Sequence, residues 1–304
     1  MSRTKAIAIS FVVCLLAAFC AAAPAPAPAA GYRKAGESAL EWTRRFVELG
    51  PRPSGSPAHR RQQALIINEL KRLNTTIIEE KFTAQTPNGP LAMNNIIAKF
   101  PGTSDRVVVL SGHYDTYNRP GLHFVGANDG GSSAGLLLAL AAELKGEPRR
   151  NAVWLLFLDG EESIRAWQDN DNTYGSRHQV EKWTEDGTIP KVTALINVDM
   201  IGDADLELLY EGYSTPWLRD LIWETGNDLG YPTVFAQTTP SYIEDDHRPF
   251  LDAGVPAVNL IDFHYGPSNR YWHTEEDTLD KLSARSFGVM AHVVLETVRK
   301  LEQR

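Results

Sequence analysis

Cysteine is nearly absent from this sequence. The 304 residues include only Cys14 and Cys20, and both lie in an apolar N-terminal segment that we expect to be removed. Phe19, directly before Cys20, does not suit a lipid-modified cleavage site. A processed chain would have no thiol, so it could form neither a disulfide framework nor a cysteine-based zinc site. Any bound metal would have to be held by nitrogen and oxygen atoms.

An apolar run of membrane-spanning length is also missing. Residues 1–30 begin with two basic residues, continue as a largely apolar run over residues 6–22, and end in small residues and a Pro-Ala repeat. The apolar run is short for a membrane span, whereas the small residues suit cleavage. We therefore predict a secretory signal peptide with a linker, a secreted or periplasmic product without a membrane span, and one domain over residues 31–304.

Basic residues are too few to form a strongly positive surface. The formal net charge is -8, and without Arg3 and Lys5 of the leader 28 basic residues face 38 acidic ones, which gives -10. A protein that binds nucleic acid through phosphates needs clustered positive charge. We therefore expect no nucleic acid partner.

Helical periodicity of apolar residues marks several segments, and no internal repeat is present. We expect helices at residues 38–49, from Ser56 or Pro57 to about Leu73, and at 133–144, 216–229 and 283–301. Ser38 and Glu41 have the spacing of a capping box, which predicts that the first helix begins at Ser38.

Short apolar or alternating segments predict six strands, at residues 76–82, 94–100, 107–110, 153–158, 194–198 and 257–261. The first two are joined by a turn at Pro87-Asn88-Gly89 and should form an antiparallel pair. The other four are nearly all apolar, which is typical of strands covered on both faces. The sum is an α/β fold: a three-layer α/β/α sandwich around a mixed, twisted sheet that is antiparallel at one edge.

Residues suited to metal binding follow several of these strands. They are His113 with Asp115, Asp129, the pair Glu161 and Glu162, Asp199, and His273. In an open α/β sheet the loops beyond the carboxyl ends of the strands converge on one crevice, so we expect these side chains to meet there. The pattern predicts a metal-dependent enzyme.

Each of these residues taken alone has a plainer interpretation. His113 and Asp115 could lie in a surface loop, and Asp129 could cap the helix that follows its glycine-rich segment. Asp199 could cap a helix or form a turn, and an isolated histidine such as His273 is more often structural. The case for a metal site therefore depends on the whole set.

The adjacent carboxylates Glu161 and Glu162 are the most specific signal. They come directly after a predicted buried strand, where two carboxylates are costly unless a cation or protons compensate them. One of the two could bind the metal while its neighbour transfers protons. The alternative is a solvated loop at the end of the strand.

Further motifs lie around this set. Asp159-Gly160-Glu161-Glu162-Ser163 is followed by Trp167 and by Tyr174-Gly175-Ser176-Arg177-His178, and Ile243-Glu244-Asp245-Asp246-His247, Trp272 and Thr86-Pro87-Asn88-Gly89 complete the pattern. With these motifs, the chain from about Gly50 onward resembles the zinc aminopeptidase-like family of co-catalytic exopeptidases, and within it the glutaminyl cyclase branch. Asn259, where animal cyclases tend to carry His, and Gly130-Gly131, which is more like peptidases, depart from that branch. So does the absence of the animal enzymes' cysteine pair.

The resemblance implies cyclisation of the N-terminal glutamine of peptides or proteins to pyroglutamate, with release of ammonia. It implies one zinc ion on Asp129, Glu162 and His273, and proton transfer by Glu161. Asp199 and Asp245 would orient the attacking amine, and Trp167, Ile243 and Trp272 would bind the substrate side chain. Each tryptophan could instead be ordinary packing.

The alternative is a secreted aminopeptidase with two zinc ions. His113 and Asp199 would then complete a second metal site that shares Asp129. In a cyclase, His113, Asp115 and Asp199 would instead support the single site.

Overall fold

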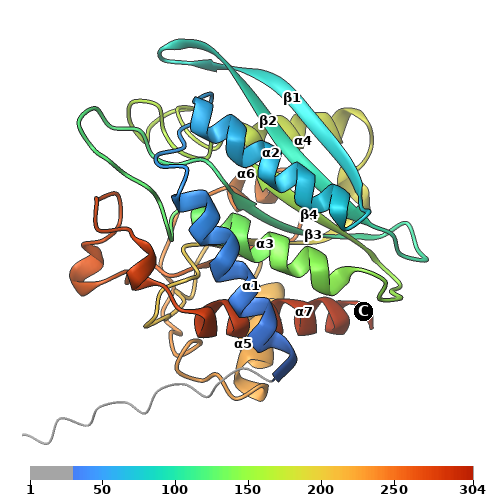
Figure 1. Cartoon of the computed structure of the whole chain (residues 1–304). Helices are drawn as coiled ribbons and strands as arrows, with labels where there is room; N and C mark the ends of the chain where they lie inside the picture. Colours follow the sequence, from blue (N-terminus) through green and yellow to red (C-terminus); the bar gives the residue numbers. More distant parts are fainter. Residues whose placement is uncertain (1–29, 304) are drawn as a thin grey trace, which may run out of the picture.

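The computed structural model describes residues 30–303 (Figure 1). The predicted signal peptide, and the linker up to residue 29, lie outside the described residues. Over residues 30–303, no helix combines the length and the apolar composition that crossing a membrane requires.

A six-stranded mixed sheet forms the centre of the fold. Its strands are β1 (Thr76–Thr86), β2 (Gly89–Phe100), β3 (Val107–His113), β4 (Ala152–Leu158), β5 (Val192–Asp199) and β6 (Ala257–Ile261), in the spatial order β1-β2-β4-β3-β5-β6. The strands β4, β3, β5 and β6 are mutually parallel, and β2 pairs antiparallel with both β1 and β4. The predicted mixed sheet with an antiparallel edge is confirmed.

Helices cover both faces of this sheet. They are α1 (Ala30–Val47), α2 (Pro57–Arg72), α3 (Gly131–Leu144), α4 (Tyr174–Glu185), α5 (Pro216–Asp228), α6 (His247–Asp252) and α7 (Ala284–Leu301). The helices α1, α2, α3, α5 and α7 pack on one face, and α4 and α6 pack on the other (Figure 1). This arrangement confirms the α/β/α sandwich.

Alternate residues of the central strands serve the two cores. In β4, Val153, Leu155 and Phe157 pack toward the face that carries α1, α3 and α7, while Leu156 and Leu158 pack toward α4 and α6. A strand buried on both faces has few positions for a polar residue until it ends. Polar side chains therefore collect where the strands stop.

Two helix starts were predicted with different success. The capping-box prediction is wrong, because α1 begins at Ala30 and Ser38 lies inside it; Ala35 and Ala39 on this helix are buried. Ser56 does cap α2, where its hydroxyl accepts the N–H of His59 at 3.1 Å.

Both β1 and β2 continue beyond their predicted ends up to the turn, and α4 and α6 were not predicted.

Candidate metal centre and active site

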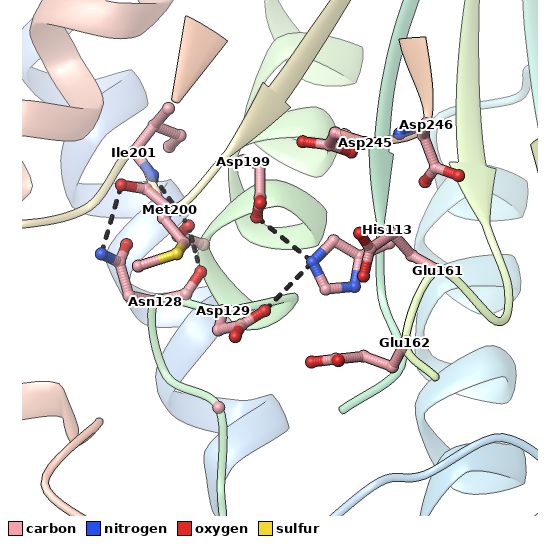
Figure 2. A network of polar contacts seen from close by, with 12 residues as sticks. His113, Asn128, Asp129, Glu161, Glu162, Asp199, Met200, Ile201, Asp245 and Asp246 are labelled. Carbon is pink, nitrogen blue, oxygen red and sulfur yellow. Dashed lines mark hydrogen bonds and ion pairs between the residues drawn. The ribbon is translucent and has the colours of Figure 1, made fainter. Parts of the chain in front are cut away.

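The predicted metal-binding residues meet at the carboxyl ends of the parallel strands. Asp129 directs Oδ1 to His113 Nε2 and Oδ2 to His273 Nε2, both at 3.2 Å. Asp199 Oδ1 lies 3.2 Å from His113 Nε2, and Glu162 Oε1 lies 3.2 Å from His273 Nε2. Asp129 therefore belongs to two groups of possible metal ligands, whose candidate ligand atoms lie within 4.8 Å of one another: with Glu162 and His273, and with His113 and Asp199, the group that Figure 2 shows.

These distances fit zinc coordination. Zinc binds nitrogen and oxygen ligands at about 2.0–2.1 Å, and the edge of such a tetrahedron is about 3.3 Å. The oxygen Glu162 Oε2 is buried without a hydrogen-bond partner among the described residues. Buried carboxylates that lack donors are stabilised by a cation. The group formed by Asp129, Glu162 and His273 has the ligand types and spacing for one zinc ion with an open fourth position.

Asp129 is held through its backbone. Its N–H and that of Asn128 donate to the carboxylate of Asp277 at 3.1 and 2.8 Å, and Tyr265 donates its hydroxyl to the same carboxylate at 2.7 Å. The helix-capping interpretation is wrong, since the N-cap of α3 is Gly130 and no side chain caps that helix. The side chain of Asp129 is free to face the two histidines.

Asn128 connects this loop to the segment after β5. Its side-chain amide donates to the carbonyl of Met200 at 3.2 Å and accepts the N–H of Gly202 at 2.8 Å (Figure 2). Met200 has a positive φ of 51°, which is uncommon for a residue with a side chain. The contacts of Asn128 hold this turn, and so they fix Asp199 at the end of β5.

Asp115 holds the backbone of Glu161 and Glu162 in place. Its carboxylate accepts their two backbone N–H groups at 3.2 and 3.3 Å. Asp115 Oδ1 lies 3.5 Å from His113 Nδ1, and this nitrogen makes no hydrogen bond with the described residues. The main contacts of Asp115 are therefore with the backbone of the acidic pair, and orientation of the histidine is secondary.

His273 lies between two aromatic rings. Tyr117 stacks on it with centroids 4.2 Å apart and planes at 7°, and Trp272 stacks at 4.1 Å and 21°. Two rings this close and nearly parallel to the imidazole must lie on its opposite faces. The stacking restricts rotation of the ring and directs Nε2 toward Asp129 and Glu162.

A second group of buried acids adjoins Glu161. Asp245 accepts the side-chain amides of Asn197 at 3.1 Å and Asn259 at 2.7 Å, and Asp246 accepts the hydroxyl of Ser176 at 2.6 Å. Figure 2 shows Asp245 and Asp246 near His113, at the end of β3, and Glu161, in the loop after β4. The hydrogen bonds fix Asp245 with neutral donors, including Asn259.

Burial dominates the electrostatics of this region. It raises the pKa of Glu161 well above its ordinary value, and the nearby negative charges of Glu162 and Asp245 add to that effect. Burial also raises the pKa of Glu162 and of Asp199 to about 7. A carboxyl group with a raised pKa can both hold and release a proton near neutral pH, which is what general acid–base catalysis requires.

Asp129 behaves in the opposite way. Burial by itself would raise its pKa, but the polar contacts and charges of His113 and His273 outweigh that effect and leave the pKa below the ordinary value. Asp129 therefore stays negatively charged between the two histidines. A permanently charged carboxylate is suited to binding a cation.

Two of the three predicted substrate-binding residues, Trp167 and Trp272, are exposed. Trp167 is 40% exposed and Trp272 is 38% exposed, so neither indole is part of the hydrophobic core. The loop that carries Trp167 is held by Asp171, which accepts the N–H groups of residues 164–166. Ile243 is half-buried and packs against the larger core.

Sequence reasoning missed several supporting residues. Asn128, Asp277 and Tyr117 position the ligands, and Glu211 ties together two loops near Asp245. Asn128 and Asp277 do lie in motifs that surround Asp129 and His273. The pattern gave no sign that they support those ligands, because the contacts join segments about 150 residues apart.

Known proteins share this fold and these motifs. The family described as "Peptidase family M28" matches residues 95–298. The glutaminyl-peptide cyclotransferase of Drosophila melanogaster is 32% identical over 254 residues, which cover 75% of this chain and 71% of that protein. A crystal structure of glutaminyl cyclase from an Acidobacteriales bacterium superimposes with a TM-score of 0.85 at 40% identity, covering 93% of this chain and 99% of that one.

A more distant structure has the same fold. It is a Zn-dependent exopeptidase from Parabacteroides distasonis, with a TM-score of 0.76 at 23% identity over 88% of this chain and 98% of that one. The Drosophila and Acidobacteriales matches are more similar to this chain in sequence, at 32% and 40% identity. The chain therefore belongs to peptidase family M28 and, within it, to the glutaminyl cyclase branch.

Proposed function

We propose that this protein is a zinc-dependent enzyme that cyclises the N-terminal glutamine of peptides or proteins to pyroglutamate and releases ammonia. One observation carries the proposal: Glu161, a buried acid with a raised pKa, directly adjoins the ligand group of Asp129, Glu162 and His273. Membership in the glutaminyl cyclase branch supports this choice of reaction.

One zinc ion would be held by Asp129, Glu162 and His273. When bound, it supplies a Lewis acid that polarises the side-chain carbonyl of the glutamine and stabilises the negative charge that develops on its oxygen. The stacked Tyr117 and Trp272 keep the His273 ring in place for this role.

Glu161 would transfer the proton. The α-amine nitrogen of the substrate bonds to the carbon of the side-chain amide, and Glu161 accepts the proton that this amine loses. The C–N bond of the amide then breaks, and Glu161 returns the proton to the departing nitrogen, which leaves as ammonia. The raised pKa of Glu161 suits both halves of this exchange.

Other side chains would position the substrate. Asp199 and Asp245 lie beside the ligand group and would orient the attacking amine. Trp167, Ile243 and Trp272 would hold the glutamine side chain folded toward its own amine, in a near-attack geometry. They would also exclude water, because an activated water molecule would hydrolyse a peptide bond instead.

A dizinc aminopeptidase is the second candidate. The ligand group of His113, Asp129 and Asp199 favours it, because a second ion there would share Asp129 with the first. Two zinc ions per chain and hydrolysis of a leucine anilide would support this alternative.

The cellular setting follows from the leader. We propose that residues 1–30 direct export and are removed, so that residues 31–304 act as a single catalytic domain on peptides outside the cytoplasm. N-terminal sequencing of protein recovered from the medium or periplasm would test this, and an intact leader would contradict it.

The reaction is tested with a peptide that begins with glutamine and with zinc-loaded protein. We expect release of ammonia and a product that keeps every residue of the chain. Glu161→Gln should lower kcat by about 10²–10⁴-fold and keep its zinc, because it removes only the proton carrier. His273→Ala should lose zinc and activity together. Release of free glutamine would refute the cyclase proposal.

A further inference from the structure

Most of the exposed large aromatic side chains are in segments that also carry site residues. Over the described residues, the exposed large hydrophobic side chains are Trp167, Tyr213, Trp217, Tyr242 and Trp272. Trp167 follows the acidic pair, Trp272 precedes His273, and Tyr242 precedes Ile243 and Asp245. Scattered exposed hydrophobics need no explanation, whereas exposed aromatic side chains that contact one another next to site residues indicate a binding surface.

Tyr242 is the most exposed of these residues, at 63%. Its ring nevertheless has a fixed support, because it lies over the backbone of Gly212: a Cβ atom placed there would come within 2.6–2.9 Å of the ring. Tyr213 contacts it edge-on, with ring centroids 5.0 Å apart and planes at 68°. A side chain at position 212 would displace the ring from this support.

The backbone beneath this pair is also fixed. Residues 210–212 and 241–243 run side by side: Gly212 donates its N–H to Ser241 at 2.7 Å, and Ser241 donates to Tyr210 at 3.1 Å. Glu211 accepts the N–H groups of Tyr213 and Ile243 at 2.8 and 3.4 Å. The two rings are therefore held in position before any partner arrives.

Arg248 also supports this pair of rings through Tyr213. Its guanidinium lies 3.9 Å from the centroid of Tyr213 and pairs with Glu244 at 3.2 Å. Because that cation is engaged, the surface that Tyr242 presents outward is an aromatic ring with one hydroxyl group. Such a surface binds apolar and aromatic side chains and contributes area at low entropic cost.

We propose that Tyr242, supported by Tyr213, binds the apolar or aromatic side chain of a residue that follows the N-terminal glutamine of the substrate. This inference rests on the proposed function. Asp245, which would orient the glutamine amine, is three residues from Tyr242, a separation of at most about 10 Å. That bound applies to the α-carbons. An extended peptide spans about 7 Å from its first α-carbon to its third, and the side chains of the peptide and of Tyr242 bridge the remainder, so the second or third side chain can reach the ring.

The test compares three peptides: Gln-Ala-Ala-Ala, Gln-Phe-Ala-Ala and Gln-Ala-Phe-Ala, each with a C-terminal amide. Wild-type protein should have a higher kcat/KM for at least one phenylalanine peptide than for the alanine peptide. Tyr242→Ala should remove this advantage, a loss of about three- to tenfold that appears mainly in KM. Its activity on the alanine peptide should stay within about twofold of wild type, and Tyr242→Phe should keep the preference.

Trp217→Ala is the matched control. Trp217 is also an exposed aromatic residue, at 38%, but it lies at the start of α5, where Thr215 contacts Ala257 at the amino end of β6. This variant should behave as wild type with all three peptides. An equal loss on all peptides in Tyr242→Ala would show that the residue only supports Ile243 and Asp245, and would overturn the proposal.

Binding is measured separately from turnover on the Glu161→Gln variant. Calorimetric Kd values for the same peptides should favour phenylalanine, and adding Tyr242→Ala should abolish that difference. If wild-type protein cyclises none of the peptides, the proposed function fails, and the Kd values still decide the role of Tyr242. Equal Kd values for all three peptides, or self-association of the protein that Tyr242→Ala abolishes, would overturn the inference.

Discussion

Carboxylates support other carboxylates throughout this site. Asp115 accepts the backbone N–H groups of Glu161 and Glu162, and Asp277 accepts those of Asn128 and Asp129. Adding negative charge beneath metal-binding acids is costly, and the backbone donors offset part of that cost. The same contacts set the direction of each ligand side chain, because they fix the backbone that carries it.

Glu211 provides a prediction on pH that is separate from the metal site. Burial raises its pKa, but His247 and the N–H and hydroxyl donors of Tyr213 and Ser214 outweigh this and lower the pKa to about 2. A lowered pKa stabilises the folded state above the ordinary pKa of about 4.5 and loses this effect as the pH falls toward 2.

We therefore expect Glu211→Gln to unfold more easily than wild type at pH 7, by about 3 kcal/mol. The difference between the two proteins should shrink by about 2 kcal/mol when the pH falls to 3. Urea unfolding at several pH values measures it. Glu37→Gln, which alters an exposed carboxylate of α1, should match wild type throughout. A difference that stays constant with pH would contradict the electrostatic explanation.

At the scale of helices and strands, the sequence predicted what depends on local periodicity. The apolar runs identified all six strands, and the segments before α2 and α7 contain the serine caps, Ser56 and Ser283, that begin these helices. The start of α1 was missed because its N-terminal part is stabilised by packing against α7, and no local signal marks it. The short helix α6 has few periodic positions, so the sequence did not indicate it either.

The close packing of α1 against α7 stabilises the N-terminal part of α1, and it gives a second prediction. A Cβ atom at Gly36 would collide with the carbonyl oxygen of Ala284 and lie 2.7 Å from Gly288 N. Because both obstacles are backbone atoms, they cannot move aside easily. Gly36→Ala should therefore lower the free energy of unfolding by about 1–3 kcal/mol.

Gly31 in the same helix is the control. It is exposed, and a Cβ atom there would meet nothing within 4 Å. Gly31→Ala should leave stability unchanged or raise it by up to about 1 kcal/mol, since alanine favours helix. Denaturant unfolding compares the two variants, and equal effects would show that α1 does not pack on α7 in this way.

Across the whole molecule, the fold collects negative charge at one edge of the sheet. Parallel strands β3, β4 and β5 end together, so residues from distant parts of the sequence meet there. The polar residues at the strand ends were predictable, because each of them follows an apolar run in the sequence. The bridging position of Asp129 came only from the family resemblance, and the support from Asp277 was not predicted, since it depends on how loops about 150 residues apart pack together.

The crowding of negative charge at the site predicts how the stability of the whole protein responds to loss of zinc. Burial holds the pKa of Glu162 and Asp199 at about 7, which means that their negative charges destabilise the folded state near neutral pH. A cation bound only by the folded protein removes that cost. At a free zinc concentration 100 times Kd, binding adds about 2.7 kcal/mol, and for a chain of this size the melting temperature should rise by about 5–10 °C.

Calorimetry of zinc-loaded and chelator-treated protein should show this difference, and added zinc should restore the higher melting temperature. His273→Ala should melt at one temperature with or without zinc, because it lacks a ligand of the proposed site. Trp217→Ala should keep the full zinc-dependent shift, since it lies outside the ligand group. If wild type and His273→Ala respond equally to zinc, the ion binds elsewhere, and the group of Asp129, Glu162 and His273 is not its site.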